Sequence, residues 1–330
     1  MPHLKQLLPA AVCSLVVLPF GIALGQGAVD DYPSRPVTIV VPSDGNSTIN
    51  TETRLFTQSI TARTGKTFVI ENKGGAGTTI GTAFVAKSKP DGYTLLSTNA
   101  AFVITPSIYP DLSFDNVKDF APITMLDTHV YVLLVHPSAP FRSVRDYIAY
   151  ARRNPEELNF STTGVGGVTH LAGALLHYMT RTKVTFVHYK APNQRILDLM
   201  SGRVNATITA PLNAMPLMNA GKLRGIGITS SVRIPLLPDL PTVAEQGVPG
   251  YEFGSWGGIL APARTPSVVI GRLNAMFVQA VKDPEIVRKL ESDGTIMVGN
   301  RPEQFRQHIV LETDRWRKLI KATGMKIDAE

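Results

Sequence analysis

Short runs of β-branched residues alternate along the chain with longer segments whose apolar positions recur at helical spacing. Gly65 stands where it would cap the C-terminus of a helix, and Pro90, Asp91 and Gly92 mark a turn before the next apolar run. This alternation predicts βαβ units, in which helices cover a sheet of parallel strands. The expected strands of this first set are residues 37–41, 68–71 and 93–97, and the expected helices are residues 50–63 and 78–87.

A second set of βα units follows two apolar runs within residues 123–135, which residues 127–130 separate. A proline-rich loop at residues 235–241 then leads to an apolar run at residues 258–261 and to terminal helices that end near Ala322. The second set comprises expected strands at residues 158–161, 184–188, 204–209 and 223–229, a helix at residues 144–153, and helices that begin near Val168, Asn193 and Pro211.

The whole pattern predicts two α/β lobes, each a mostly parallel sheet flanked by helices, which the chain connects by two crossings. We expect residues 29–127 and 256–330 in the first lobe and residues 128–255 in the second. Two crossings form a hinge, and open α/β sheets bind ligands at the carboxyl ends of their strands. The cleft between the lobes is therefore the expected ligand site.

The first 28 residues have the pattern of a cleavable secretory signal, because Lys5 precedes an apolar run over residues 10–24 and small residues follow it. An uncleaved membrane anchor is the alternative, although the run is short for a membrane span. The one cysteine, Cys13, falls in this run. A mature chain that begins after Ala28 would therefore contain neither a thiol nor a disulfide.

Composition and charge narrow the class of partner. The chain has 330 residues, of which 44% are hydrophobic, and this apolar content predicts a sizeable folded core. Its formal net charge of +7 is spread along the sequence without a block of basic residues. The charge favours an anionic ligand, and the lack of a basic stripe interleaved with aromatic residues argues against nucleic acid.

Motifs of catalytic chemistry are incomplete in this sequence. The nucleophile-elbow pattern around Ser255 has Phe253 in place of its first glycine, and the dinucleotide pattern that starts at Gly164 ends on Thr169. None of the seven histidines pairs with another at i, i+4 or at zinc-finger spacing. We therefore predict no catalytic residue, no metal ligand and no cofactor. A hydrolase stays a weaker alternative, since carboxylates from distant strands can form a catalytic pair.

Two polar loops, one in each expected lobe, connect a strand to a helix and are candidates for ligand binding. Amides at a helix N-terminus lack partners within the helix, and the helix dipole adds partial positive charge, so a carboxylate could bind there. Helix capping and a plain turn are the alternatives, with His170 hydrogen-bonded within the protein. The first loop offers Ser43, Asn46, Ser47, Thr48 and Asn50; the second offers Thr162, Thr163, Gly164, Val165, Gly166 and His170; Thr98, at the end of the third strand, completes this part of the predicted site.

Ordered motifs along essentially the whole mature chain resemble the Bug family of extracytoplasmic solute receptors, the binding components of tripartite tricarboxylate transporters. They are Tyr32-Pro33-Ser34-Arg35-Pro36, Glu71-Asn72-Lys73-Gly74-Gly75-Ala76-Gly77, Pro90-Asp91-Gly92-Tyr93-Thr94-Leu95-Leu96, and matches at residues 170–173, 189–190, 221–224, 237–245 and 261–266.

The resemblance implies a two-lobed fold of the periplasmic-binding-protein type and a periplasmic receptor that needs no cofactor. It implies that the two loops hold a carboxylate, partly through bridging water, and that the partners are a small and a large integral membrane component of a transporter. We expect a monomer. A periplasmic sensor subunit that signals to a membrane kinase is the alternative.

Departures from the family pattern bear on the ligand. Ser43, Asn46, Ser47 and Asn50 stand where the family usually has Phe, two glycines and Asp. Asn205 and Thr209 stand where Asp is frequent, and Arg195 stands where a small residue is usual. Each change removes an acid, adds a base or adds a polar side chain, and an Arg can hold a carboxylate through two hydrogen bonds. We therefore predict that Arg195 and Thr209 contribute to a site for a dicarboxylate, aromatic dicarboxylates included. The alternative is that Asn205 and Arg195 are solvated surface residues.

Overall fold

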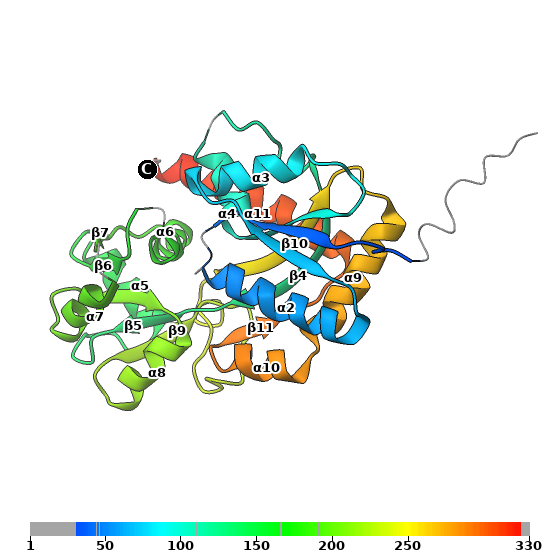
Figure 1. Cartoon of the computed structure of the whole chain (residues 1–330). Helices are drawn as coiled ribbons and strands as arrows, with labels where there is room; N and C mark the ends of the chain where they lie inside the picture. The colour runs from blue at the N-terminus through cyan, green and yellow to red at the C-terminus, as the bar shows by residue number, and fades with distance from the viewer. Residues whose placement is uncertain are drawn as a thin grey trace, which may run out of the picture.

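The computed structural model describes residues 31–324 except residues 44, 46, 110, 166, 190 and 191. This part of the chain forms two α/β lobes, each built on its own sheet (Figure 1). The predicted secretory signal lies outside the described residues. Among the helices that are described, none combines the length and the apolar character needed to cross a membrane.

The first lobe is built on a six-stranded sheet, whose strands are β1 (Val37–Val41), β2 (Phe68–Asn72), β3 (Thr94–Asn99), β4 (Phe120–His129), β10 (Ser255–Pro262) and β11 (Thr295–Met297). They lie in the order β11-β4-β10-β3-β1-β2. β1 is parallel to β2 and β3, whereas β10 is antiparallel to β3 and β4, and β11 is antiparallel to β4.

Helices cover both faces of this sheet, because neighbouring residues of a strand point to opposite faces. Ile39 of β1 packs in the cluster that contains α2 and α9, while Val40 packs in the cluster that contains α4 and α11 (Figure 1). The helical elements of this lobe are α2 (Thr48–Thr64), η1 (Ala76–Thr78), α3 (Thr79–Ala86), α4 (Ala101–Ile104), η2 (Thr105–Ser107), α9 (Ser267–Val281), α10 (Pro284–Glu291) and α11 (Pro302–Thr323).

The second lobe is built on a five-stranded sheet, whose strands are β5 (Val132–Val135), β6 (Asn159–Thr162), β7 (Thr185–His188), β8 (Ala206–Thr209) and β9 (Arg224–Ile228), in the order β7-β6-β8-β5-β9. Its helices are α5 (Val144–Arg153), α6 (Val168–Thr180), α7 (Pro192–Met200) and α8 (Pro211–Asn219). β6 is parallel to β7 and β8, whereas β5 is antiparallel to β8 and β9.

The two-lobed α/β fold is confirmed, but both sheets are mixed rather than mostly parallel. Each antiparallel pair contains at least one strand at a crossing, namely β4, β5, β9 or β10. The chain passes from β4 in the first sheet through Val130 and Tyr131 to β5 in the second, and it returns from β9 to β10. β4 and β10 are antiparallel neighbours over eight residue pairs between Ser255–His129 and Pro262–Phe120. A strand that continues into another lobe leaves no room for the helical crossover that a parallel neighbour would need.

Local signals explain why the helices begin and end where they do. Ser47 caps α2, since its hydroxyl accepts a hydrogen bond from the Asn50 amide, and Gly65 ends the same helix with a φ of 69°. Ser143 caps α5 in the same way through the Asp146 amide. The predicted Gly65 cap and the predicted bounds of α5 are thus confirmed.

Candidate functional site

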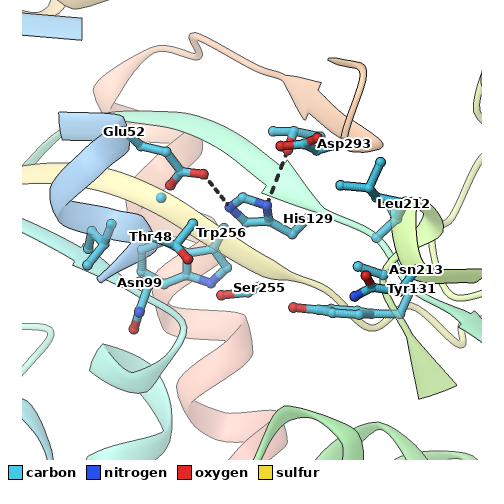
Figure 2. A pocket seen from close by; sticks show the side chains of 15 residues that line it. Thr48, Glu52, Asn99, His129, Tyr131, Leu212, Asn213, Ser255, Trp256 and Asp293 are labelled. Atoms are coloured by element: carbon cyan, nitrogen blue, oxygen red, sulfur yellow. Dashed lines mark hydrogen bonds and ion pairs between the residues drawn. The ribbon is translucent and has the colours of Figure 1, made fainter. Parts of the chain in front are cut away.

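A cavity of about 390 Å³ lies between the two lobes, at the crossings (Figure 2). The first turn of α2 and the end of β4 line it from one side, and the first turn of α8 lines it from the other. Its walls are Thr48, Ile49, Glu52, Asn99, His129, Val130, Tyr131, Ala210, Leu212, Asn213, Ser255, Trp256, Gly257, Asp293 and Thr295.

A second cavity of about 320 Å³ adjoins the first, because Asn99 and Ser255 line both. Gly167 and Val168, at the start of α6, contribute the wall from the second lobe. The facing wall comes from η1, α4 and η2 of the first lobe, together with Trp316 of α11. The two cavities therefore form one interlobe site, into which helix starts of both lobes project.

The first predicted loop reaches this site through Thr48, which lines the first cavity. The Ser43 and Ser47 hydroxyls lie 2.6 Å apart and share a hydrogen bond. Asn50 is buried, donates to the Gly45 carbonyl at 2.5 Å and accepts from Asn72 at 3.1 Å. Ser43, Ser47 and Asn50 thus hold the loop together. Asn46, which was also predicted to bind ligand, lies outside the described residues.

The second predicted loop is likewise held by internal hydrogen bonds. The hydroxyl of Thr162 shares a hydrogen bond with His188 Nδ1 at 2.6 Å, and the Thr163 amide donates to Thr169 Oγ1 at 2.8 Å. Gly164 has a φ of 131°, a conformation that side chains rarely allow. Gly166 lies outside the described residues.

Val165 and His170 of the predicted set line a different cavity, which lies between α6, β7 and the end of α11. His170 is 6% exposed, and its ring packs edge-on against Phe186 with the ring centroids 4.7 Å apart. The second loop therefore reaches the interlobe site through the residues that follow it, Gly167 and Val168, and His170 does not line that site. A ligand contact by His170 stays a prediction.

Arg195 is 6% exposed, so the alternative that it is a solvated surface residue is wrong. Its Nη1 donates to Thr207 Oγ1 at 2.7 Å and to the Ile208 carbonyl at 3.1 Å, and its Nη2 donates to Thr209 Oγ1 at 3.3 Å. Burial lowers the pKa of Arg195. The guanidinium thus binds the edge of β8, where Thr209 leads directly into the cavity residue Ala210. Thr98 is fully buried, and its hydroxyl has no partner among the described residues.

The polar wall of the first cavity contains a buried group of two carboxylates and an imidazole. His129 Nε2 lies 3.4 Å from Glu52 Oε1 (Figure 2). The same nitrogen lies 3.4 Å from Asp127 Oδ1. Burial raises the pKa of Glu52. Burial alone would lower the pKa of His129, but the two carboxylates more than offset it and raise that pKa to about 10. At neutral pH the His129 imidazole is therefore protonated, and it lies between the Glu52 and Asp127 carboxyl groups.

Sequence reasoning missed Glu52, Asn99, His129 and the cavity residues of α8. Asn99 could have been found, because it ends β3 and carboxyl ends of strands were the expected ligand edge. Glu52 stands one helical turn after Thr48, on the same face of α2. Asp127 and His129 stand two residues apart and so share one face of β4. An Asp and a His two residues apart do not form the His-to-His spacing that is typical of metal sites, so no motif in the sequence indicates this group.

Histidines beside the third cavity make stability depend on pH. His177 is 5% exposed, and burial lowers its pKa to about 3. The unfolded chain takes up this proton near pH 6.5, whereas the folded chain does not, so stability falls as pH decreases below 6.5. We expect His177 to lower the free energy of unfolding by about 1.4 kcal/mol for each pH unit between 6.5 and 3.

The check is urea denaturation of the wild type and of His177→Gln at pH 7, 6 and 5. Only the difference in pH dependence matters, because Gln also changes the hydrogen bonds to Tyr147 and Thr182. Below pH 6.5 the free energy of unfolding of the variant should fall less steeply than that of the wild type, by about 1.4 kcal/mol for each pH unit. Identical slopes in the two proteins would contradict the assignment.

Comparison with known proteins gives a consistent match over most of the chain. The profile of the tripartite tricarboxylate transporter family receptors matches residues 53–325. BugT of Bordetella pertussis is 30% identical, and the alignment covers 96% of this chain and 98% of BugT. Two solved structures are also similar. Rpa4515 of R. palustris with adipate is 34% identical with a TM-score of 0.69, over 89% of this chain and 99% of that one. MatC of Rhodopseudomonas palustris with bound malate is 29% identical with a TM-score of 0.66, over 88% and 100%.

Proposed function

Because the chain belongs to the tripartite tricarboxylate transporter receptor family, we propose that it captures a small organic carboxylate in the periplasm and delivers it to a tripartite transporter. The resemblance to the Bug family is thereby confirmed, and members of this family are solute-binding receptors. The proposal includes a small and a large integral membrane component as partners, a monomeric receptor, and no chemical conversion of the ligand.

The observation that carries this proposal is the interlobe site itself. Residues in the first turns of α2 and α8 line one cavity, and residues at the start of α6 line the other. Free amides in the first turn of a helix bind carboxylates without a full positive charge, so an anion can be released again. Walls from both lobes mean that a bound ligand stabilises the closed arrangement of the hinge.

We also propose that the two lobes move relative to each other when a ligand binds. We place the lobe boundaries close to the predicted ones, residues 29–127 and 256–330 for one lobe and 128–255 for the other. They move by one or two residues so that all of β4 and β10 belongs to the first lobe. The hinge then lies where β4 continues into β5 and where the chain returns to β10. Closure would bring Thr48 and Asn99 of the first lobe toward Asn213 and Val168 of the second around the ligand.

For the ligand class we propose a dicarboxylate. Adipate and malate, which are named with two related structures, are both dicarboxylates. Two adjoining cavities that share Asn99 and Ser255 give room for one carboxylate in each. The loops also carry Asn50 and Thr209 where the family pattern has Asp, so they add no negative charge beside an anion.

Isothermal titration calorimetry with matched pairs of acids tests this proposal. Adipate and hexanoate both have six carbons, but only adipate has a second carboxylate. Malate differs from lactate only by one added carboxylate group. We expect each dicarboxylate to bind at least about tenfold more tightly, or about 1.4 kcal/mol. Equal affinities within both pairs would refute the dicarboxylate assignment, and absence of binding by all carboxylates would refute the receptor function.

A further inference from the structure

The buried group Glu52, Asp127 and His129 presents three potential metal-ligand atoms from two elements of the first lobe. One carboxylate oxygen of each acid and one ring nitrogen of His129 all lie within 4.8 Å of one another. Asp127 and His129 come from the same face of β4, and Glu52 comes from α2 across the sheet edge. Glu52 and Asp127 are 6% and 0% exposed, so this is a buried donor set rather than a surface cluster of acids.

Asp127 shows that the group is incompletely satisfied by the protein. Its Oδ1 accepts a hydrogen bond from the Gly257 amide at 3.0 Å. Its Oδ2 is buried and has no hydrogen-bond partner among the described residues. A buried carboxylate oxygen without a partner costs free energy, because water would have solvated it. A Cβ at Gly257 would lie 2.8 Å from Asp127 Oδ1, so the glycine is what admits this carboxylate.

The distances fit a shared cation better than hydrogen bonds. An imidazolium and a carboxylate that bond well lie about 2.7–2.9 Å apart. His129 Nε2 instead lies 3.4 Å from both carboxylates, so its one N–H makes at best a long, shared hydrogen bond to the two acceptors. Neighbouring ligand atoms around a tetrahedral zinc ion, at bonds of about 2.0–2.1 Å, are separated by about 3.3 Å.

We propose that Glu52, Asp127 and His129 bind one divalent transition-metal ion of the Zn²⁺ class in the wall of the interlobe site. One imidazole with two carboxylates suits such an ion better than Ca²⁺ or Mg²⁺, which prefer oxygen ligands only. Thr295 Oγ1, at 3.3 Å from His129 Nδ1, fixes the ring so that Nε2 points at the acids. Glu52 and His129 line the first cavity, so the remaining coordination position faces the ligand.

The metal would also remove an electrostatic conflict, and this part of the inference rests on the proposed function. The carboxyl groups of Glu52 and Asp127 would repel an anionic ligand that binds beside them. A divalent cation held by both carboxyl groups would lower this repulsion. The metal could accept a ligand carboxylate directly.

Calorimetric titration of the chelator-treated, untagged protein with ZnCl₂ tests the site. We expect one equivalent of Zn²⁺ to bind with a dissociation constant of about 1 µM or tighter, and CaCl₂ to bind at least about 100-fold more weakly. Asp127→Asn keeps an oxygen for the Gly257 amide but loses the anionic ligand, and it should weaken Zn²⁺ at least about 100-fold. Asp314→Asn is the control, because Asp314 is half-exposed on α11 and lines neither interlobe cavity, and this variant should bind Zn²⁺ within about threefold of the wild type.

Zinc X-ray absorption spectroscopy of the zinc-loaded wild type tests the site without any variant, so a folding defect cannot affect the result. The spectrum should show one imidazole among oxygen ligands. Zn²⁺ binding weaker than about 1 mM, binding that Asp127→Asn leaves unchanged, or a spectrum without imidazole would each overturn the proposal. The carboxylate panel on chelator-treated protein separates this result from the proposed function. Loss of carboxylate binding with intact zinc binding would refute only the receptor function.

Discussion

Asn99→Asp is expected to weaken carboxylate binding by at least about 100-fold, which corresponds to about 2.7 kcal/mol. Asn99 and Ser255 are the two described residues that line both cavities. Asn99 Oδ1 accepts from the Ala101 amide at 3.0 Å, so its Nδ2 is the group left to donate to an anion. The substitution keeps the acceptor and replaces the donor by a negative charge. At about 4 Å from a carboxylate this costs up to about 4 kcal/mol.

The matched control is Asn205→Asp. Asn205 Oδ1 also accepts from a backbone amide, that of Asn159 at 2.7 Å, but Asn205 lines neither interlobe cavity. Both variants carry the same added charge and retain the same kind of hydrogen bond. Calorimetry with adipate should separate them, while their melting temperatures stay close to that of the wild type. Equal affinities for the two variants would mean that the ligand does not contact Asn99.

The sequence pattern correctly predicts those helices and strands whose ends are fixed by neighbouring residues in the chain. α5 has a serine cap before its first turn and two arginines in its last, and its predicted bounds match the structure. β4 differs, because the sequence analysis separated two runs at residues 127–130, whereas the strand continues to His129. Polar residues within a strand resemble a turn in sequence. His129 is tolerated there because it lies beside the carboxyl groups of Asp127 and of Glu52, which is distant in sequence. Asp127 in turn accepts a hydrogen bond from the Gly257 amide of β10.

The candidate site was predictable only in outline, for the same reason. The helix starts were predicted, and Thr48 does line the cavity. Which side chains turn inward depends on neighbours that no local pattern encodes. Ser47 and Asn50 bond within their loop, and Arg195 turns onto β8 because Thr207 and Thr209 offer oxygens there. The family pattern identifies such positions but not the direction of their side chains.

Trp316→Ala is expected to lower the free energy of unfolding by about 3–5 kcal/mol. Trp316 is 2% exposed, packs edge-on against Phe253 with centroids 5.8 Å apart, and donates through Nε1 to Glu312 at 3.1 Å. Phe253 belongs to the segment that returns from the second lobe, so the indole anchors this crossing to α11 of the first. Truncation leaves a cavity at the junction of the lobes, which the rigid strands on either side cannot fill.

Urea denaturation measures this loss of stability, which should appear as a lower urea concentration at the midpoint of unfolding. Leu311→Ala is the control on the same helix, because Leu311 is 69% exposed and its truncation should change stability by less than about 0.5 kcal/mol. Since Trp316 also lines the second cavity, its loss should weaken carboxylate binding as well as stability. A variant that loses stability but keeps full affinity would show that the return crossing supports the fold without shaping the ligand site. In that case the ligand would depend on the other crossing, from β4 to β5, where His129 and Tyr131 line the first cavity.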